Sequence, residues 1–149
     1  AAARDPDALI AGQPQFDSSA PRSRTLGRHI CNFWIRVETL SGAIGDAMCG
    51  FRVYPLESVM RLAAGCRLGR RMDFDVEILV KLYWSGVAVV PIATQVTYPA
   101  GGRSNFRMVQ DNWLLTKLHT RLFFGMVRQL HLLLARKGGL AQMKRSGAS

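Results

Sequence analysis

Three short segments, far apart in the chain, combine carboxylates, cations and glycines in an order suited to chemistry on a phosphorylated ligand. The first is D-A-M-C-G-F-R-V-Y over residues 46–54, the second is M-D-F-D-V-E-I-L-V over 72–80, and the third is Y-P-A-G-G-R-S-N-F-R over 98–107. A positioned carboxylate can take a proton from a hydroxyl group. An arginine can bind phosphate oxygens through paired hydrogen bonds. We therefore expect the three segments to form one site that deprotonates a hydroxyl and holds a phosphate.

In the first segment, Asp46 is a candidate for orienting or deprotonating an acceptor hydroxyl. A loop aspartate can equally hold nearby backbone N–H groups, so both roles stay open. Gly50 would let the backbone pass close to a ligand. Arg52, on an alternating strand, could pair with Asp46 or face a phosphate. Phe51 is interpreted as a core residue.

The second segment places Asp75 and Glu77 at the start of a predicted helix, where the helix dipole favours negative charge. Each carboxylate could therefore serve the helix terminus, or one of them could act as a general base. Asp73 is interpreted as a helix cap. The segment thus offers two candidate catalytic acids, separated by Val76.

The third segment is a glycine-rich loop with phosphate-binding character. Gly101 and Gly102 leave the backbone free to turn its N–H groups inward, and Arg103 can bind phosphate in bidentate fashion. Ser104 is grouped with Arg103 as a candidate phosphate ligand. Arg107 could supply a further positive charge.

In this order the segments resemble the C-terminal half of a family 2 glycosyltransferase of the GT-A fold, close to the polyprenyl-phosphate and lipid-associated branch. The similarity rests on Asp46 with the following G-F-R, on Asp75 and Glu77, and on the G-R-S of residues 102–104, and it covers roughly residues 8–125. It implies inverting transfer of a sugar from a nucleotide-diphosphate donor to a lipid-linked or glycan acceptor. Within this resemblance Glu77 best matches the general base, with Asp75 as the other candidate.

The resemblance also implies a divalent metal, Mg²⁺ or Mn²⁺, in the full enzyme. D-P-D at residues 5–7 spells a metal-binding motif, but it precedes an apolar run, whereas the motif normally follows a strand; we expect a turn there and no metal ligands in this chain. The nucleotide-binding half is likewise expected outside it. The chain is therefore interpreted as a fragment or short relative, inactive alone, that works at the cytoplasmic face of the membrane in envelope glycan or lipid synthesis.

Composition limits the alternatives. The 149 residues suit one domain, and the net charge of +10 indicates an anionic partner. Nucleic acid is disfavoured because Trp and Phe fall at core spacing instead of forming a stacking platform. A non-enzymatic module that binds anionic lipid, or an assembly subunit, remains the alternative function. The three cysteines form no C-x-x-C pair, which indicates reduced thiols.

The alternation of strand and helix patterns predicts an α/β fold: a partial GT-A, Rossmann-like domain that provides the acceptor side. The expected elements are a strand at 8–11, a loop at 13–24, a helix at 25–41 capped by Thr25, a strand at 51–54, helices at 56–64 and 74–84, a buried strand at 87–92 ending at Pro91 and an edge strand at 95–98. Residues 1–107 would form the acceptor-side half. Arg22, Arg24 and Arg28 could contact a diphosphate or form a solvated face.

The last part of the chain, residues 108–137, predicts a long basic amphipathic helix with a kink at Gly125, followed by a disordered tail at 138–149. Such a helix could lie in the interface of an anionic bilayer, as a peripheral membrane contact, or pack on the domain with a solvated basic side. No run of 18 apolar residues is present, so no membrane-spanning segment is expected.

Overall fold

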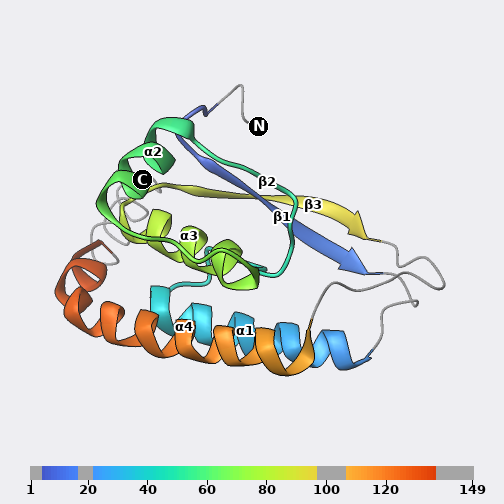
Figure 1. Cartoon of the computed structure of the whole chain (residues 1–149). Helices are drawn as coiled ribbons and strands as arrows, with labels where there is room; N and C mark the ends of the chain where they lie inside the picture. The colour runs from blue at the N-terminus through green and yellow to red at the C-terminus, as the bar shows by residue number, and fades with distance from the viewer. Residues whose placement is uncertain (1–4, 17–21, 97–106, 137–149) are drawn as a thin grey trace.

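The computed structural model describes residues 5–16, 22–96 and 107–136 as a mixed α/β fold with one small sheet (Figure 1). The elements, in chain order, are β1 (Leu9–Phe16), α1 (Arg22–Thr39), β2 (Arg52–Val53), α2 (Leu56–Gly65), α3 (Met72–Trp84), β3 (Val89–Val96) and α4 (Met108–Arg128). A further helical segment, 130–136, follows α4. The prediction of an α/β fold is therefore confirmed at this coarse level.

The sheet has the order β2-β1-β3 and mixes both strand directions. β1 and β3 are parallel over eight residues, from Leu9 opposite Val89 to Phe16 opposite Val96. β2 is antiparallel to β1, with Ile10 opposite Val53 and Ala11 opposite Arg52. Parallel strands require a long crossover connection, and here it contains α1, β2, α2 and α3. The short β2 thus delivers Arg52 to the edge of the sheet.

α3 is the central helix of the fold. Six of its residues are buried: Val76, Glu77, Ile78, Leu79, Val80 and Leu82. Its C-terminus is closed by Gly86, which has φ of 94°, a conformation that glycine adopts without steric cost. The Gly86 N–H bonds to Tyr83 O and the Val87 N–H to Leu82 O, which is the Schellman arrangement. This helix end agrees with the stop predicted at Gly86.

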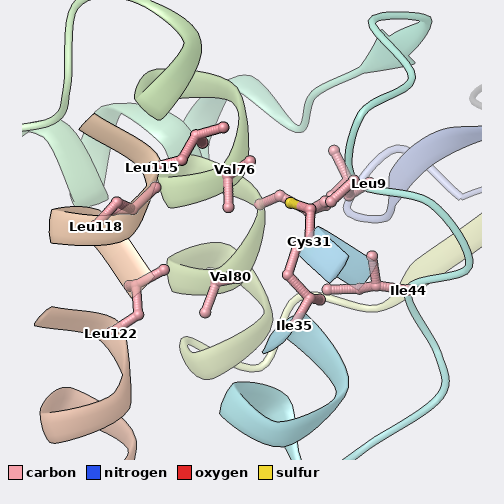
Figure 2. Packing of buried hydrophobic residues seen from close by; sticks show 11 residues of the cluster. Leu9, Cys31, Ile35, Ile44, Val76, Val80, Leu115, Leu118 and Leu122 are labelled. Atoms are coloured by element: carbon pink, nitrogen blue, oxygen red, sulfur yellow. The ribbon is translucent and has the colours of Figure 1, made fainter. Parts of the chain in front are cut away.

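The core lies where three helices meet the start of β1. Cys31 and Ile35 of α1, Val76 and Val80 of α3, and Leu115, Leu118 and Leu122 of α4 pack together with Leu9 and Ile44 (Figure 2). In Figure 1, α3 is drawn between the three strands and the helix pair α1 and α4. Because α4 supplies three buried leucines, it is part of the same hydrophobic core.

Several predicted strand boundaries were wrong. β1 does not end at residue 11 but continues to Phe16, through part of the predicted loop at 13–24. The strands predicted at 87–92 and 95–98 are replaced by one strand, β3 (Val89–Val96), which passes through Pro91. Among the described strands, β3 pairs with β1 alone, so it lies at an edge of the sheet. The prediction of a buried strand at 87–92 was therefore wrong. An edge position tolerates Pro91, whose nitrogen has no hydrogen to donate.

Two helix boundaries also differ from the prediction. α1 begins at Arg22 and not after a cap at Thr25. α4 is interrupted at Gln129, four residues beyond the predicted kink at Gly125. The absence of a side chain at Gly125 serves packing instead, since an added Cβ would lie 2.9 Å from Cη2 of Trp84. In the described residues, no helix is both long enough and apolar enough to cross a membrane.

Candidate functional site

The loop that carries the first motif is tied to α1 through Asp46. The Asp46 carboxylate is buried, and Nη1 of Arg28 lies 2.7 and 2.6 Å from its two oxygens. Oδ1 also accepts a hydrogen bond from the Met48 backbone N–H at 2.8 Å. Asn32 accepts the Ala47 N–H at 3.0 Å. Asp46 therefore holds the loop in place, and Arg28 is paired with it instead of forming a solvated face.

Arg52 joins the first motif to the second. Its side chain is 1% exposed, and its guanidinium donates hydrogen bonds to the backbone oxygens of Ala47 and Asp75. Nη1 also lies 4.0 Å from the Asp75 carboxylate and 3.2 Å from the Tyr54 hydroxyl. Arg52 therefore does not pair with Asp46, which was one of its two predicted roles. Arg52 instead clamps the 46–52 loop onto the first turn of α3.

The two candidate bases on α3 have opposite surroundings. The Asp75 side chain is 51% exposed, whereas Glu77 has no exposed surface. Oε2 of Glu77 accepts the Gly69 N–H at 2.8 Å, and Oε1 lies 2.8 Å from both Lys81 Nζ and Arg121 Nη2. Oε1 accepts no hydrogen bond of regular geometry, so these two contacts are ionic. Glu77 therefore links α3 to α4 and to the preceding loop.

The start of α4 is tied to the start of α3 through Asp111. Oδ1 of Asp111 accepts hydrogen bonds from Nε and Nη2 of Arg71, both at 3.2 Å. Oδ2 accepts the backbone N–H of Arg107 at 2.7 Å. Arg107 is the last residue of the third motif, so this contact brings the end of that motif to the second one.

All three motifs thus approach the N-terminal end of α3. Arg52 connects the first motif to this helix end, and the Arg71–Asp111 pair connects the end of the third. Gly50 is exposed, with open space where a Cβ would be, so its backbone is accessible. The proposed phosphate ligands Arg103 and Ser104 lie outside the described residues.

The ionised, hydrogen-bonded carboxylate of Asp111 should make the free energy of unfolding depend on pH. The Arg107 backbone N–H and the Arg71 guanidinium hold the pKa of this carboxyl below its ordinary value of 3.8. Its stabilising effect is therefore complete above pH 3.8 and is lost as pH falls through the folded-state pKa. We expect Asp111→Asn to lower the free energy of unfolding at neutral pH and to reduce its fall below pH 3.8, measured by urea denaturation. Asp5→Asn, at an exposed turn, should change neither; equal acid sensitivity of the Asp111 variant and the parent would contradict this.

Sequence reasoning assigned no role to His119, yet it joins a buried polar cluster between α1 and α4. His119 Nδ1 lies 2.8 Å from Glu38 Oε1, and Nε2 lies 3.6 Å from Cys31 Sγ. Burial raises the pKa of Glu38, although the bond to His119 opposes this. The only sequence signal was that Glu38 and His119 stand among apolar helical positions, which does not reveal that the two residues meet.

A thiol beside a histidine and a carboxylate can be an activated nucleophile, but the surroundings of Cys31 oppose that state. Burial, together with the charges of Glu38 and Asp46, raises the pKa of the Cys31 thiol to about 12. Buried thiols with raised pKa values are inert. The cluster therefore acts as part of the α1–α4 packing.

Thiol labelling checks this assignment. We expect iodoacetamide to modify the half-buried Cys66 at least about tenfold faster than Cys31 or Cys49, which are buried. Timed labelling followed by peptide mass spectrometry measures the three rates, and labelling in urea provides the control in which all three become accessible. Labelling of Cys31 at the rate of Cys66 in the folded protein would contradict an inert thiol.

Phe51 is 56% exposed, so its interpretation as a core residue was wrong; its neighbour Arg52 takes the buried side of the strand. Residues 5–7 form an exposed turn before β1, as predicted. Among the described residues, no three His, Cys, Asp or Glu side chains are grouped so that they could hold a metal ion.

Comparison with protein-family models, with curated proteins and with solved structures gives no match to this chain. The class that the coordinates define is a mixed α/β domain with a three-stranded sheet.

Proposed function

We propose that this chain forms the acceptor side of a family 2 glycosyltransferase, which transfers a sugar from a nucleotide-diphosphate donor to a lipid-linked or glycan acceptor with inversion. The proposal rests on one observation, which is that the three sequence motifs approach one another at the N-terminal end of α3. Arg52 joins the loop of Asp46 to Asp75, and Arg71 with Asp111 joins α3 to Arg107. A transferase needs this arrangement because base, acceptor and phosphate ligands must surround one reacting oxygen.

In this proposal Asp75 is the general base. Its carboxylate is half exposed beside the buried Arg52, so it can reach an acceptor hydroxyl. Glu77, which the family resemblance favours, has no exposed surface and is already ion-paired with Lys81 and Arg121. Asp46 would act as a positioning residue that fixes the loop through Arg28 and Met48.

The remaining parts of the reaction are assigned outside the described residues. Arg103 and Ser104 would hold a phosphate of the donor or of the lipid acceptor. A divalent metal, Mg²⁺ or Mn²⁺, would stabilise the leaving diphosphate from ligands on the nucleotide-binding half. The enzyme would work at the cytoplasmic face of the membrane, where a lipid-linked acceptor is available.

Substitution of Asp75 tests the proposal. In the complete enzyme, with the nucleotide-binding half present, Asp75→Asn is expected to lower kcat by about a hundredfold or more while KM for the donor changes little. The assay follows transfer of radiolabelled sugar from a panel of nucleotide-diphosphate sugars to polyprenyl phosphate and to glycan acceptors. Asp73→Asn is the matched control, because Asp73 lies on the same helical turn and its carboxylate accepts the Arg71 N–H at 3.0 Å, which an amide oxygen can also do.

Three outcomes would contradict the proposal. Full activity of Asp75→Asn would exclude Asp75 as the base, and an equal loss in Asp73→Asn would show that the effect is local structure. Absence of transfer from every donor to every acceptor would remove the glycosyltransferase assignment itself. Circular dichroism of each variant confirms that the comparison is made between folded proteins.

A further inference from the structure

The helix pair α1 and α4 has an outer face that no described residue covers. The two helices contact each other through Trp34, which stacks on His119 and meets Phe123 edge to face at a ring-centroid distance of 6.4 Å. They run side by side along one border of the molecule, on the far side of α3 from the sheet (Figure 1). The inner faces of both helices pack in the hydrophobic core, and their outer faces point away from it.

This outer face is unusually apolar. On α1, Leu26, Ile30 and Phe33 are 64%, 54% and 60% exposed and recur at spacings of four and three. On α4, Trp113 and Phe124 are 59% and 63% exposed. Residues at these spacings share one side of a helix. The full set of exposed apolar residues, which we call the α1/α4 face, is Leu26, Ile30, Phe33, Trp34, Val109, Trp113, Phe124 and Val127.

A groove of about 560 Å³ lies within this face, between the two helices. Leu26, Ile30 and Trp34 line one wall, and Thr116 and Phe123 contribute to the other. Trp34 of α1 and Phe123 of α4 both line the groove, so apolar side chains of the two helices meet there, beside the polar Asn112 and Thr120 of α4. Contiguous exposed apolar surface of this kind marks a binding region.

The charges around the α1/α4 face are of one sign. Exposed cations on the described parts of the helices are Arg36, Lys117 and Arg128, and also Arg121, which is paired with Glu77. Nζ of Lys117 lies 4.8 Å from the centre of the Trp113 ring. The acidic residues of α1 and α4, Glu38 and Asp111, have no exposed surface. Across its described residues, the face thus presents apolar side chains and positive charge without an exposed carboxylate.

From these observations we infer that the α1/α4 face binds the surface of a bilayer that contains anionic lipids. Trp and Phe suit the headgroup boundary, and Lys and Arg beside them are attracted to negative headgroups. A protein partner or a second copy of this chain would cover apolar residues equally well. The second copy is disfavoured because it would bring the cations of one face against the same cations of the other. This inference does not depend on sugar transfer.

Vesicle flotation tests the inference with the chain as it stands. The chain should float with phosphatidylcholine vesicles that contain phosphatidylglycerol and much less with phosphatidylcholine alone. The double variant Trp113→Glu with Phe124→Glu should reduce the bound fraction at least about tenfold. The matched control is Leu56→Glu with Met60→Glu on α2, which changes two residues of 74% and 64% exposure and adds the same charge outside the face; it should float like the parent.

Four other results would contradict the inference that the α1/α4 face binds anionic bilayers. Equal loss in both double variants would mean that charge alone drives binding, and no loss in either would exclude the α1/α4 face. If no vesicle binds and sedimentation shows a dimer that Trp113→Glu with Phe124→Glu dissociates, a second copy covers the face. Failure of flotation beside intact sugar transfer to a water-soluble acceptor would remove this inference and leave the proposed function standing.

Discussion

Replacement of Glu77 by alanine is expected to lower the free energy of unfolding by about 3 kcal/mol. The carboxylate is fully buried, accepts the Gly69 N–H and lies 2.8 Å from both Lys81 and Arg121. Its removal leaves the Gly69 N–H without a partner and two cations without their counter-ion. We place the effect at the lower end for a broken buried ion pair, because Arg121 is 61% exposed and can regain hydration.

Urea denaturation followed by circular dichroism measures this effect. The matched control is Glu57→Ala, which removes a carboxylate 3.7 Å from Arg61 at the surface, with side chains 79% and 72% exposed. It should change the free energy of unfolding by less than about 0.5 kcal/mol. Equal effects of the two substitutions would show that Glu77 does not hold α3 and α4 together.

The result for Glu77 also affects how activity data are interpreted. A Glu77 variant that loses sugar transfer and about 3 kcal/mol of stability has lost its helix packing, so the activity loss alone would not identify a base. Loss of transfer in Asp75→Asn with unchanged stability would identify one. The two carboxylates, two positions apart in the sequence, can be separated experimentally because only Glu77 is buried.

The second large effect is expected at Gly12, where an alanine should lower the free energy of unfolding by about 2 kcal/mol. A Cβ on Gly12 would lie 2.9 Å from both Cys49 Sγ and the Phe51 carbonyl oxygen. The Gly12 N–H donates to that same oxygen at 2.8 Å, so the strand cannot move away without losing the bond. The substitution should therefore displace the loop that carries Asp46 and Gly50.

Gly27→Ala is the control for this experiment. Gly27 lies within α1, and nothing approaches its added Cβ within 4 Å. Alanine in a helix interior is more favourable than glycine, so this variant should gain up to about 1 kcal/mol. Urea denaturation should thus give opposite signs for the two glycines. A loss of stability at Gly27, or none at Gly12, would contradict the close packing of Gly12 against Cys49 and Phe51.

The presence of the helices could be predicted from the local sequence pattern. The apolar spacing of α1, α2 and α3 and the stop at Gly86 are visible in the chain because a helix buries one side and ends where glycine can turn it. The predicted ends of the strands were less accurate, as β1 and β3 show. Their extent depends on pairing with each other across more than 70 residues, which a local pattern does not contain.

For the site, the sequence predicted candidate catalytic or phosphate-binding residues near loops and a helix start, namely Asp46, Arg52, Asp75 and Glu77. It could not rank the two acids on α3, because burial of Glu77 depends on Arg121, 44 positions further along, which the fold brings to 2.8 Å.

Residue types and their spacing by themselves determined the α/β class, the helices and the segments able to do chemistry, since propensity and periodicity act between neighbours in sequence. Tertiary structure alone decided which side chains meet: Asp46 with Arg28, Arg52 with Asp75, and Glu38 with His119. The physical reason is that the protonation and exposure of a carboxylate depend on the charges and solvent around it, and these come from distant parts of the chain.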